Sequence, residues 1–583
     1  MLLHGPGTVN RGAHARMRAM TRRSAGQGHP LLLWLLLAVF FLQMITASPI
    51  KSPTFDEPAH IGAGLSYWTM RDFRVNPQHP PLLKELGALP LVLTGARFPM
   101  TRADWDNVGD PPPVFFQWQL GRDVIFGNNP NSVMFRARLP FILLAVLLGG
   151  LIFAWGRRLL GATAATGALL LYVFDPNILA HAPLVATDSG FAAFTVLSLF
   201  ALWWYLNHRS PKRLVLCGLA LGLMLATKFS ALILLPVALA LLILATRWIP
   251  AEAPIRSSSL VDPFASEDGG QRLVWCVYAF LAMAVLAALV IEAVYLFPRN
   301  PFLYVEGVRR INADHDPTYQ AFMAGAFKPH FLTYYLVCYL VKEPLPAIAL
   351  AAIGGWAVLR RGALPDMDRA FLFLPPLALF LAYSIYSDNL GFRYLIPVLP
   401  FLHLAGGAGL AFLVREGGVW RRAVAAVLSV WAVVAGTAIY PDHLSYFNEL
   451  ACVTEPSRLG LDGGWRCGPR WLDDSNVDWG QGMKQLRTWL AAHPPQGPLR
   501  LGYFGSIRPE TYGVEAMGVR VDDLLAPPQP GVYVLSAHIL ARARARLREL
   551  HGDGPENWLL HARLSAIVGH AYYVYDIPET PGR

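Results

Sequence analysis

Charged residues are scarce in this chain of 583 residues, in which Asp, Glu, Lys and Arg together account for only 15%. No acidic residue precedes Asp56. Hydrophobic residues make up 54% of the chain, and they gather in long runs. Soluble globular domains carry about 25% charged residues and lack such runs. The composition therefore excludes a soluble globular protein and predicts a polytopic α-helical membrane protein.

Long apolar runs recur along the chain, and most approach the ~20 residues that a helix needs to cross the hydrocarbon core of a bilayer. We expect about eleven membrane spans, near residues 30–47, 137–155, 163–182, 189–206, 214–227, 229–247, 273–297, 343–359, 369–386, 394–413 and 422–440. The two short runs beside Lys228 have a second interpretation, as one kinked unit. The first run is longer than the core of a signal peptide, which favours an uncleaved anchor.

Lys and Arg gather at every second junction between these runs, and the positive-inside rule places such clusters in the cytoplasm. Residues 1–29 are then a cytoplasmic basic N-terminus, whereas residues 48–133 and 441–583 lie outside. In a bacterium this arrangement corresponds to the inner membrane, with the outer segments facing the periplasm or exterior. The net charge of +10 mostly reflects this topology. Because the basic residues form no stripe, no nucleic-acid partner is expected.

The composition changes after residue 441. Aromatic and β-branched runs at 532–535 and 571–575 predict strands, and the patterns at 480–490 and 539–551 predict helices. At this length the segment is expected to form one extracytoplasmic α/β domain. A polar and aromatic run at 471–481 has two interpretations: it packs a small core, or it lines a sugar site.

The chain has five cysteines. Cys452 and Cys467 both fall in the segment expected outside the cytoplasm, where disulfides persist, so they are predicted to pair with each other. Cys217, Cys276 and Cys338 lie in or beside apolar runs and are expected to be packed or lipid-facing thiols.

Ionisable residues stand at the predicted outer ends of several spans. They are Asp56 and Glu57 after the first span, Asp188 before the fourth, Lys228 between two short runs, Lys342 and Glu343 at the eighth, and Asp388 and Arg393 before the tenth. Such residues are costly near hydrocarbon, and their default interpretation is functional. Each one alone is also compatible with an interfacial side chain that reaches back to water.

Cations at a membrane surface suit a lipid-linked phosphate, and Arg is favoured for forked phosphate contacts. A neighbouring carboxylate suits a general base that activates an acceptor hydroxyl. His60 follows Asp56 by four residues, so the two share a face if the chain is helical there. These residues together predict the transfer of a group from a lipid phosphate donor to an acceptor outside the cytoplasm.

Several motifs resemble the superfamily of protein O-mannosyltransferases and aminoarabinose transferases, which are membrane glycosyltransferases of the GT-C fold. The motifs are Phe55-Asp56-Glu57, Asn76-Pro77-Gln78-His79-Pro80-Pro81-Leu82, Thr187-Asp188, Thr227-Lys228 and Gly391-Phe392-Arg393-Tyr394-Leu395-Ile396-Pro397. The resemblance covers roughly residues 30–440. The segment after 441 does not match the sugar-binding repeat module of the eukaryotic mannosyltransferases, which leaves the acceptor class open.

The resemblance implies an inverting transfer of a sugar from a polyprenyl-phosphate donor. By this analogy Asp56 is the catalytic base with Glu57 beside it, and Asp188 is a second acidic residue of the site. Lys228 and Arg393 are phosphate-binding positions, and Lys84 and His60 are further candidates for substrate binding. A protein, a lipid or a glycan remains possible as the acceptor, and the sugar is not specified.

Two other classes of function are a transporter and a scaffold. A transporter or flippase of a lipid-linked or polar solute would place ionisable residues near the bilayer midplane and often contain internal repeats, neither of which the sequence shows. A scaffold that only presents the C-terminal domain would not need so many spans. No cofactor is expected and no metal site is indicated, because the run Asp314-His315-Asp316 cannot turn three adjacent side chains toward one ion on regular structure.

Overall fold

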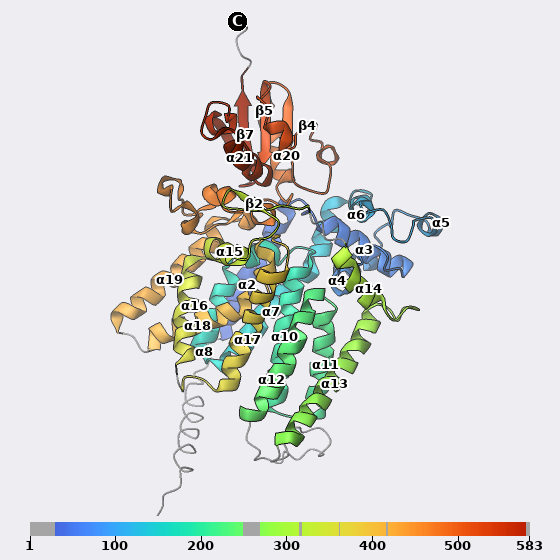
Figure 1. The fold of residues 1–583 in the computed structure, drawn as a ribbon, viewed down its shortest axis with the longest axis vertical. Coiled ribbons are helices and arrows are strands. Elements are labelled where there is room, and N and C mark those ends of the chain that lie inside the picture. The colour runs from blue at the N-terminus through green and yellow to red at the C-terminus, as the bar shows by residue number, and fades with distance from the viewer. Residues whose placement is uncertain (1–29, 249–268, 314–317, 361, 416–417, 579–583) are drawn as a thin grey trace, which may run out of the picture.

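A computed structural model describes residues 30–248, 269–313, 318–360, 362–415 and 418–578 (Figure 1). Long helices form a bundle, short helices and loops form a layer across one end of it, and a small sheet domain stands on that layer (Figure 1). The predicted cytoplasmic N-terminus and the Asp314-His315-Asp316 run lie outside the described residues.

Seven helices in the described ranges are long and apolar enough to cross a membrane. They comprise α2 (Pro30–Ala47), α7 (Pro130–Leu159), α10 (Thr187–Asn207), α12 (Leu234–Trp248) with the turn before it, α13 (Gly269–Val294), α17 (Asp366–Tyr386) and α19 (Val419–Ala438). An eighth span is formed if α15 (Tyr334–Lys342) and α16 (Leu345–Leu359), which meet at 112°, count as one broken unit. The chain is thus a polytopic helical membrane protein, as the sequence predicts.

The remaining predicted spans contain shorter helices: the apolar helices α8 (Ala162–Val173) and α18 (Leu399–Arg415), and α11 (Pro211–Leu225). The run predicted at 163–182 is divided, because Asp175 caps a new helix, α9 (Pro176–His181), with Pro176 in its first turn. Every predicted span therefore contains apolar helix, and the count of eleven stays a prediction.

The layer above the bundle contains α3 (Glu57–Met70), α4 (Leu82–Leu93), α5 (Arg102–Asp106), α6 (Phe116–Phe126), α14 (Leu303–Ala313) and the hairpin of β1 (Ala321–Met323) and β2 (Ala326–Lys328). Glycines let α3 approach its neighbours closely. A Cβ on Gly64 would lie 2.1 Å from the Lys84 carbonyl oxygen, and one on Gly62 would lie 2.7 Å from the Gly121 nitrogen. This tight packing fixes the helix that begins directly after Asp56.

The C-terminal domain has a five-stranded sheet in the order β4-β3-β5-β7-β6. Its strands are β3 (Leu499–Gly502), β4 (Met517–Gly518), β5 (Gly531–Ser536), β6 (Leu564–Val568) and β7 (Tyr572–Ile577). The pairs β3–β4 and β3–β5 are parallel, and β5–β7 and β6–β7 are antiparallel. With α20 (Met483–Ala492) and α21 (Ala537–His551), both predicted strands and both predicted helices are present, so the α/β class is confirmed.

The segment 441–482 lies between the bundle and this sheet, and it consists of short 3-10 turns. Asn448 donates its backbone N–H to the Val341 carbonyl at 2.8 Å, and Lys342 Nζ donates to the Leu444 carbonyl at 2.9 Å. The segment is therefore bound to the membrane helices, although the predicted domain boundary at 441 assigns it to the C-terminal domain. The Cys452–Cys467 disulfide is formed as predicted, and Cys217, Cys276 and Cys338 are buried free thiols.

Candidate functional site

The loop that carries Asp56 is held by the polar and aromatic run at 471–481. Phe55 donates its backbone N–H to the Trp479 carbonyl at 2.8 Å, and Ser52 donates to the Gln481 carbonyl at 2.9 Å. On the other side, Ser506 Oγ donates to the Phe55 carbonyl at 2.7 Å. A segment more than 400 residues away in sequence therefore fixes the backbone on which the predicted base stands.

Asp56 and Arg393 form an ion pair. The Arg393 Nη1 group donates to Asp56 Oδ2 at 2.6 Å, and the Asp56 side chain is 25% exposed. The guanidinium lies over the Trp479 ring, 4.6 Å from its centroid. Its Nε is buried and has no hydrogen-bond partner in the described part of the chain. Arg393 thus orients the carboxylate of Asp56.

The turn before Arg393 is shaped by a second contact with the same run. Gly391 has φ +108°, and a Cβ there would lie 2.3 Å from Ser475 Oγ, so glycine is required on both counts. Asn476 Oδ1 accepts the Phe392 backbone N–H at 2.9 Å, and Ser475 Oγ donates to the Leu390 carbonyl at 2.8 Å. The run at 471–481 therefore positions both members of the Asp56–Arg393 pair.

Asp188 and Lys228 form a second pair close to the first. Lys228 Nζ donates to Asp188 Oδ1 at 2.6 Å, and both side chains are largely buried. Lys228 also lies 4.2 Å from the centroid of the Tyr394 ring, and Arg393 lies 5.7 Å from the same ring. The structure therefore brings together four predicted site residues, two acids and two cations, around one tyrosine that sequence analysis gave no role.

Glu57 is fully buried and bound on all sides. It accepts hydrogen bonds from Arg138 at 2.6 and 2.7 Å, from the Thr54 N–H at 2.8 Å and from the Val185 N–H at 3.1 Å. Burial alone would raise the pKa of Glu57, but the charge and hydrogen bonds of Arg138 bring it below its usual value. Its two oxygens are thus committed to holding the loop in place.

Lys84 is also buried and saturated with protein contacts. Its Nζ donates to Tyr67 Oη and to the Asn76 carbonyl at 2.6 Å each, and to the His79 carbonyl at 2.7 Å. Burial lowers the pKa of this ammonium, against the opposing charge of Glu85. Three acceptors for three N–H groups leave no donor for a phosphate, so the predicted phosphate contact of Lys84 finds no support in this geometry.

His60 and His79 lie beside the two charge pairs. His60 Nδ1 is 2.9 Å from the Val185 carbonyl, and burial lowers the pKa of His60 to about 4, so this ring is neutral at neutral pH. The His79 ring is 5.2 Å from the His60 ring. Burial lowers the pKa of His79, and Lys228 and Arg393 are among the charges acting in the same direction. His79 belongs to the Asn76–Leu82 motif, which could have pointed to it.

Acidic residues of the 471–481 run connect the site to the sheet domain. Asp473 accepts from Arg542 Nε of α21 at 2.6 Å, and burial raises its pKa to about 7 despite that arginine. Asp474 has φ +55° and interacts electrostatically with Arg393 and Asp56. Of the two interpretations of this run, the packing role is the one its contacts show.

Part of the chain matches a family of known proteins. A family model described as dolichyl-phosphate-mannose-protein mannosyltransferase matches residues 110–260, which is less than half of the chain and includes Arg138, Asp188 and Lys228. No curated protein matches. The match agrees with the resemblance carried by the motifs, and the chain is similar to GT-C membrane glycosyltransferases.

The chain is similar to two solved structures at low sequence identity. The crystal structure of ArnT from Cupriavidus metallidurans bound to undecaprenyl phosphate is 16% identical, with 94% of this chain and 97% of that chain covered and a TM-score of 0.45. The apo oligosaccharyltransferase from Archaeoglobus fulgidus is 12% identical, with 90% of this chain and 72% of that chain covered and a TM-score of 0.43.

Proposed function

We propose that this chain is a membrane glycosyltransferase that moves a sugar from a polyprenyl-phosphate donor to an acceptor hydroxyl outside the cytoplasm, with inversion at the sugar carbon. The observation that carries the proposal is the convergence of Asp56, Arg393, Asp188 and Lys228 in two adjacent ion pairs. The family-model match over residues 110–260 supports the class of donor and reaction.

In this mechanism Arg393 and Lys228 bind the donor phosphate. Both cations lie close to the Tyr394 ring, and Arg393 has a buried Nε that no described residue uses. As the bond between the sugar carbon and the phosphate oxygen breaks, negative charge grows on the departing lipid phosphate. Two fixed cations stabilise that charge more strongly than water would, because the site is largely buried.

Asp56 acts as the general base. The acceptor oxygen attacks the sugar carbon on the face opposite the phosphate, its proton passes to the Asp56 carboxylate, and the lipid phosphate leaves with the bonding electron pair. Arg393 holds that carboxylate through their ion pair. A donor phosphate competes for the same guanidinium, so donor binding would free an Asp56 oxygen for the acceptor hydroxyl.

The neighbouring predicted residues act by positioning. Glu57 and Arg138 fix the loop that precedes α3, and Lys84 fixes the turn at Asn76 to His79. Asp188 orients Lys228. In this proposal Glu57 and Lys84 therefore support the site, whereas the sequence resemblance implies a direct role in the chemistry for Glu57 and in substrate binding for Lys84.

The location of the charges favours a transferase over a transporter. Asp56 directly precedes α3, Asp188 is in the first turn of α10, and Lys228 and Arg393 stand at short 3-10 turns that precede α12 and α18. All four therefore lie at the ends of elements on the side of the outer layer. A transporter is expected to hold such groups near the bilayer midplane.

A deletion strain tests the proposed class. Mass spectrometry of cell-surface glycans, glycolipids and glycoproteins from the deletion strain should show the loss of one sugar modification relative to the parent. A plasmid-borne wild-type copy should restore it. An Asp123→Asn copy should restore it equally, because Asp123 is an exposed acid of α6 that pairs only with its neighbour Arg122 among the described residues. Identical glycan profiles in the deletion strain and its parent would argue against a glycosyltransferase.

A further inference from the structure

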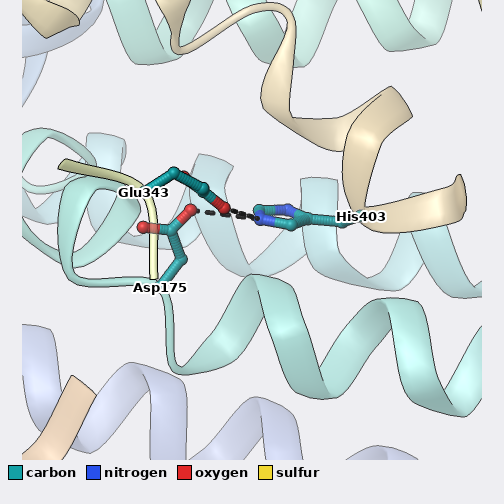
Figure 2. Close-up of side chains that lie close together, drawn as sticks. All are labelled: Asp175, Glu343 and His403. Atoms are coloured by element: carbon teal, nitrogen blue, oxygen red, sulfur yellow. Dashed lines mark ion pairs between the residues drawn. The ribbon is translucent and has the colours of Figure 1, made fainter. Parts of the chain in front are cut away.

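Three buried side chains from distant parts of the chain converge outside the proposed catalytic site (Figure 2). Asp175 precedes α9, Glu343 lies in the break between α15 and α16, and His403 belongs to α18. Each side chain is 1% exposed. Their ligand atoms all lie within 4.8 Å of one another, and Figure 2 shows both carboxylates facing the same edge of the imidazole.

Two of the polar atoms at this point lack ordinary partners in the described part of the chain. Asp175 Oδ1 accepts the backbone N–H of Asn177 at 2.7 Å, whereas its Oδ2 faces His403 Nε2 at 3.1 Å. Glu343 Oε2 and His403 Nδ1 are buried and have no hydrogen-bond partner among the described residues. Buried polar atoms normally have hydrogen-bond partners, so two exceptions side by side are a reason to consider a bound water or ion.

The charge of the cluster also favours a bound cation. Two carboxylates carry a charge of −2, and a protonated His403 would leave −1 in a buried site. The ammonium of Lys342 is nearby but donates to the backbone carbonyls of Leu444 and Asn476 instead. An uncompensated buried charge is costly. A divalent cation bound by two carboxylates and a neutral imidazole would bring the sum to zero.

The distances suit such an ion. His403 Nε2 is 3.1 Å from Asp175 Oδ2 and 3.6 Å from Glu343 Oε1. Ligand atoms at about 2.0–2.2 Å from zinc in a tetrahedral arrangement are roughly 3.3–3.6 Å apart. One imidazole nitrogen and two carboxylate oxygens form a donor set that divalent transition metals accept.

We infer that Asp175, Glu343 and His403 form a binding site for one divalent transition-metal ion, with zinc as the best fit. The three residues come from elements that also lead to the proposed catalytic site. The chain from α9 reaches Asp188 at the start of α10, and α18 follows the turn that carries Arg393. The ion would link these elements to one another through its three ligands. This inference does not depend on the proposed glycosyl transfer.

Metal analysis of the purified full-length chain tests the site. After desalting in detergent, inductively coupled plasma mass spectrometry of the wild type should find about one zinc, or one other divalent transition metal, per chain. Glu343→Gln and His403→Gln should each lose most of it. His443→Gln is the matched control, since His443 is also buried but its Nε2 lies 3.1 Å from the Gly436 carbonyl and outside the cluster. This control should keep the metal.

Thermal unfolding keeps the test decisive if a variant folds poorly. A strong zinc chelator should lower the Tm of the wild type and of His443→Gln, and added zinc chloride should restore it. The same treatments should leave the Tm of Glu343→Gln unchanged. Wild-type protein without stoichiometric metal, with a Tm that does not respond to chelator or zinc, would overturn the inference and leave the cluster as an ion pair around a protonated histidine. Equal metal in the wild type and both cluster variants would overturn it as well.

Discussion

Replacement of Arg393 by alanine tests how the donor phosphate is held. In the structure this guanidinium pairs with Asp56 at 2.6 Å, lies over the Trp479 ring and keeps its buried Nε without a partner in the described ranges. A hydrogen bond to a charged group contributes about 1.5–3 kcal/mol. Its loss corresponds to a roughly 10- to 140-fold increase in the Kd for a polyprenyl phosphate.

The conservative variant sharpens this test. Arg393→Lys should recover only part of the affinity, because an ammonium lacks the planar fork and stacks less well on an aromatic ring. Arg122→Ala is the matched control, since Arg122 is a partly exposed arginine of α6 that pairs with Asp123. It should leave the affinity unchanged.

The assay is a binding titration of the detergent-solubilised protein with a short-chain polyprenyl phosphate. Size-exclusion profiles and the Tm of each variant show whether the fold is intact. An Arg393→Ala protein that is folded and binds the lipid phosphate with wild-type affinity would refute the assignment. Arg393 would then serve only to hold Asp56.

Four further predictions concern the frame around the site, the disulfide and the membrane topology. Glu57→Gln should lower stability by about 3–5 kcal/mol because it leaves Arg138 buried and unpaired, and a wild-type Tm would contradict this. Since the folded pKa of Glu57 is below its usual value, its stabilising contribution should be complete at neutral pH, begin to fall once the pH drops below the ordinary glutamate pKa, and be lost as the pH falls through the lowered folded pKa, which Tm measurements against pH can follow. Replacement of Cys452 and Cys467 by serine opens a loop with a separation of 15 residues and should cost about 3 kcal/mol, and alkylation of both thiols in unreduced wild-type protein would disprove the bond. Met517→Cys, exposed in the C-terminal domain, should react with an impermeant thiol reagent in intact cells, whereas Val419→Cys at the start of α19 should not; the reverse pattern would invert the topology.

The sequence pointed to the residues of the candidate site, but not to the contacts between them. Asp56, Asp188, Lys228 and Arg393 were identifiable because ionisable residues are rare and costly beside apolar spans. Their pairing was not, because Asp56 and Arg393 are 337 positions apart and meet only when the outer ends of distant helices converge. Tyr394 and Trp479, which lie against these cations, carry no charge and look like ordinary aromatic residues in sequence.

The surroundings of Lys84 and Glu57 could not be predicted from residue type. A lysine near a predicted site suggests a phosphate ligand, but the chain turns back at Asn76 to His79 and saturates the Lys84 ammonium with carbonyl oxygens. Glu57 is adjacent to Asp56, yet helix geometry turns the two side chains to different surroundings. One is partly exposed at the site, and the other is sealed against Arg138.

The fold class of the membrane part and that of the C-terminal domain were predictable from the sequence. Long apolar runs predicted the helical membrane part, and alternating aromatic and β-branched residues predicted strands β5 and β7. The helix break at Pro176 was harder to place, because this residue sits inside a run that hydropathy alone treats as continuous. The role of the segment 441–482 depends on contacts with residues far away in sequence, which periodicity does not encode.

The most direct test of the central claim is the turnover of an Asp56→Asn variant. Asparagine is close in shape to aspartate but cannot accept the proton of an acceptor hydroxyl. In reconstituted membranes, with the donor and acceptor identified from the deletion strain, turnover should fall by about 10² to 10⁴, while binding of a polyprenyl phosphate is retained. Glycosyl transfer at the wild-type rate in this variant would remove Asp56 from the chemistry and contradict the proposed mechanism.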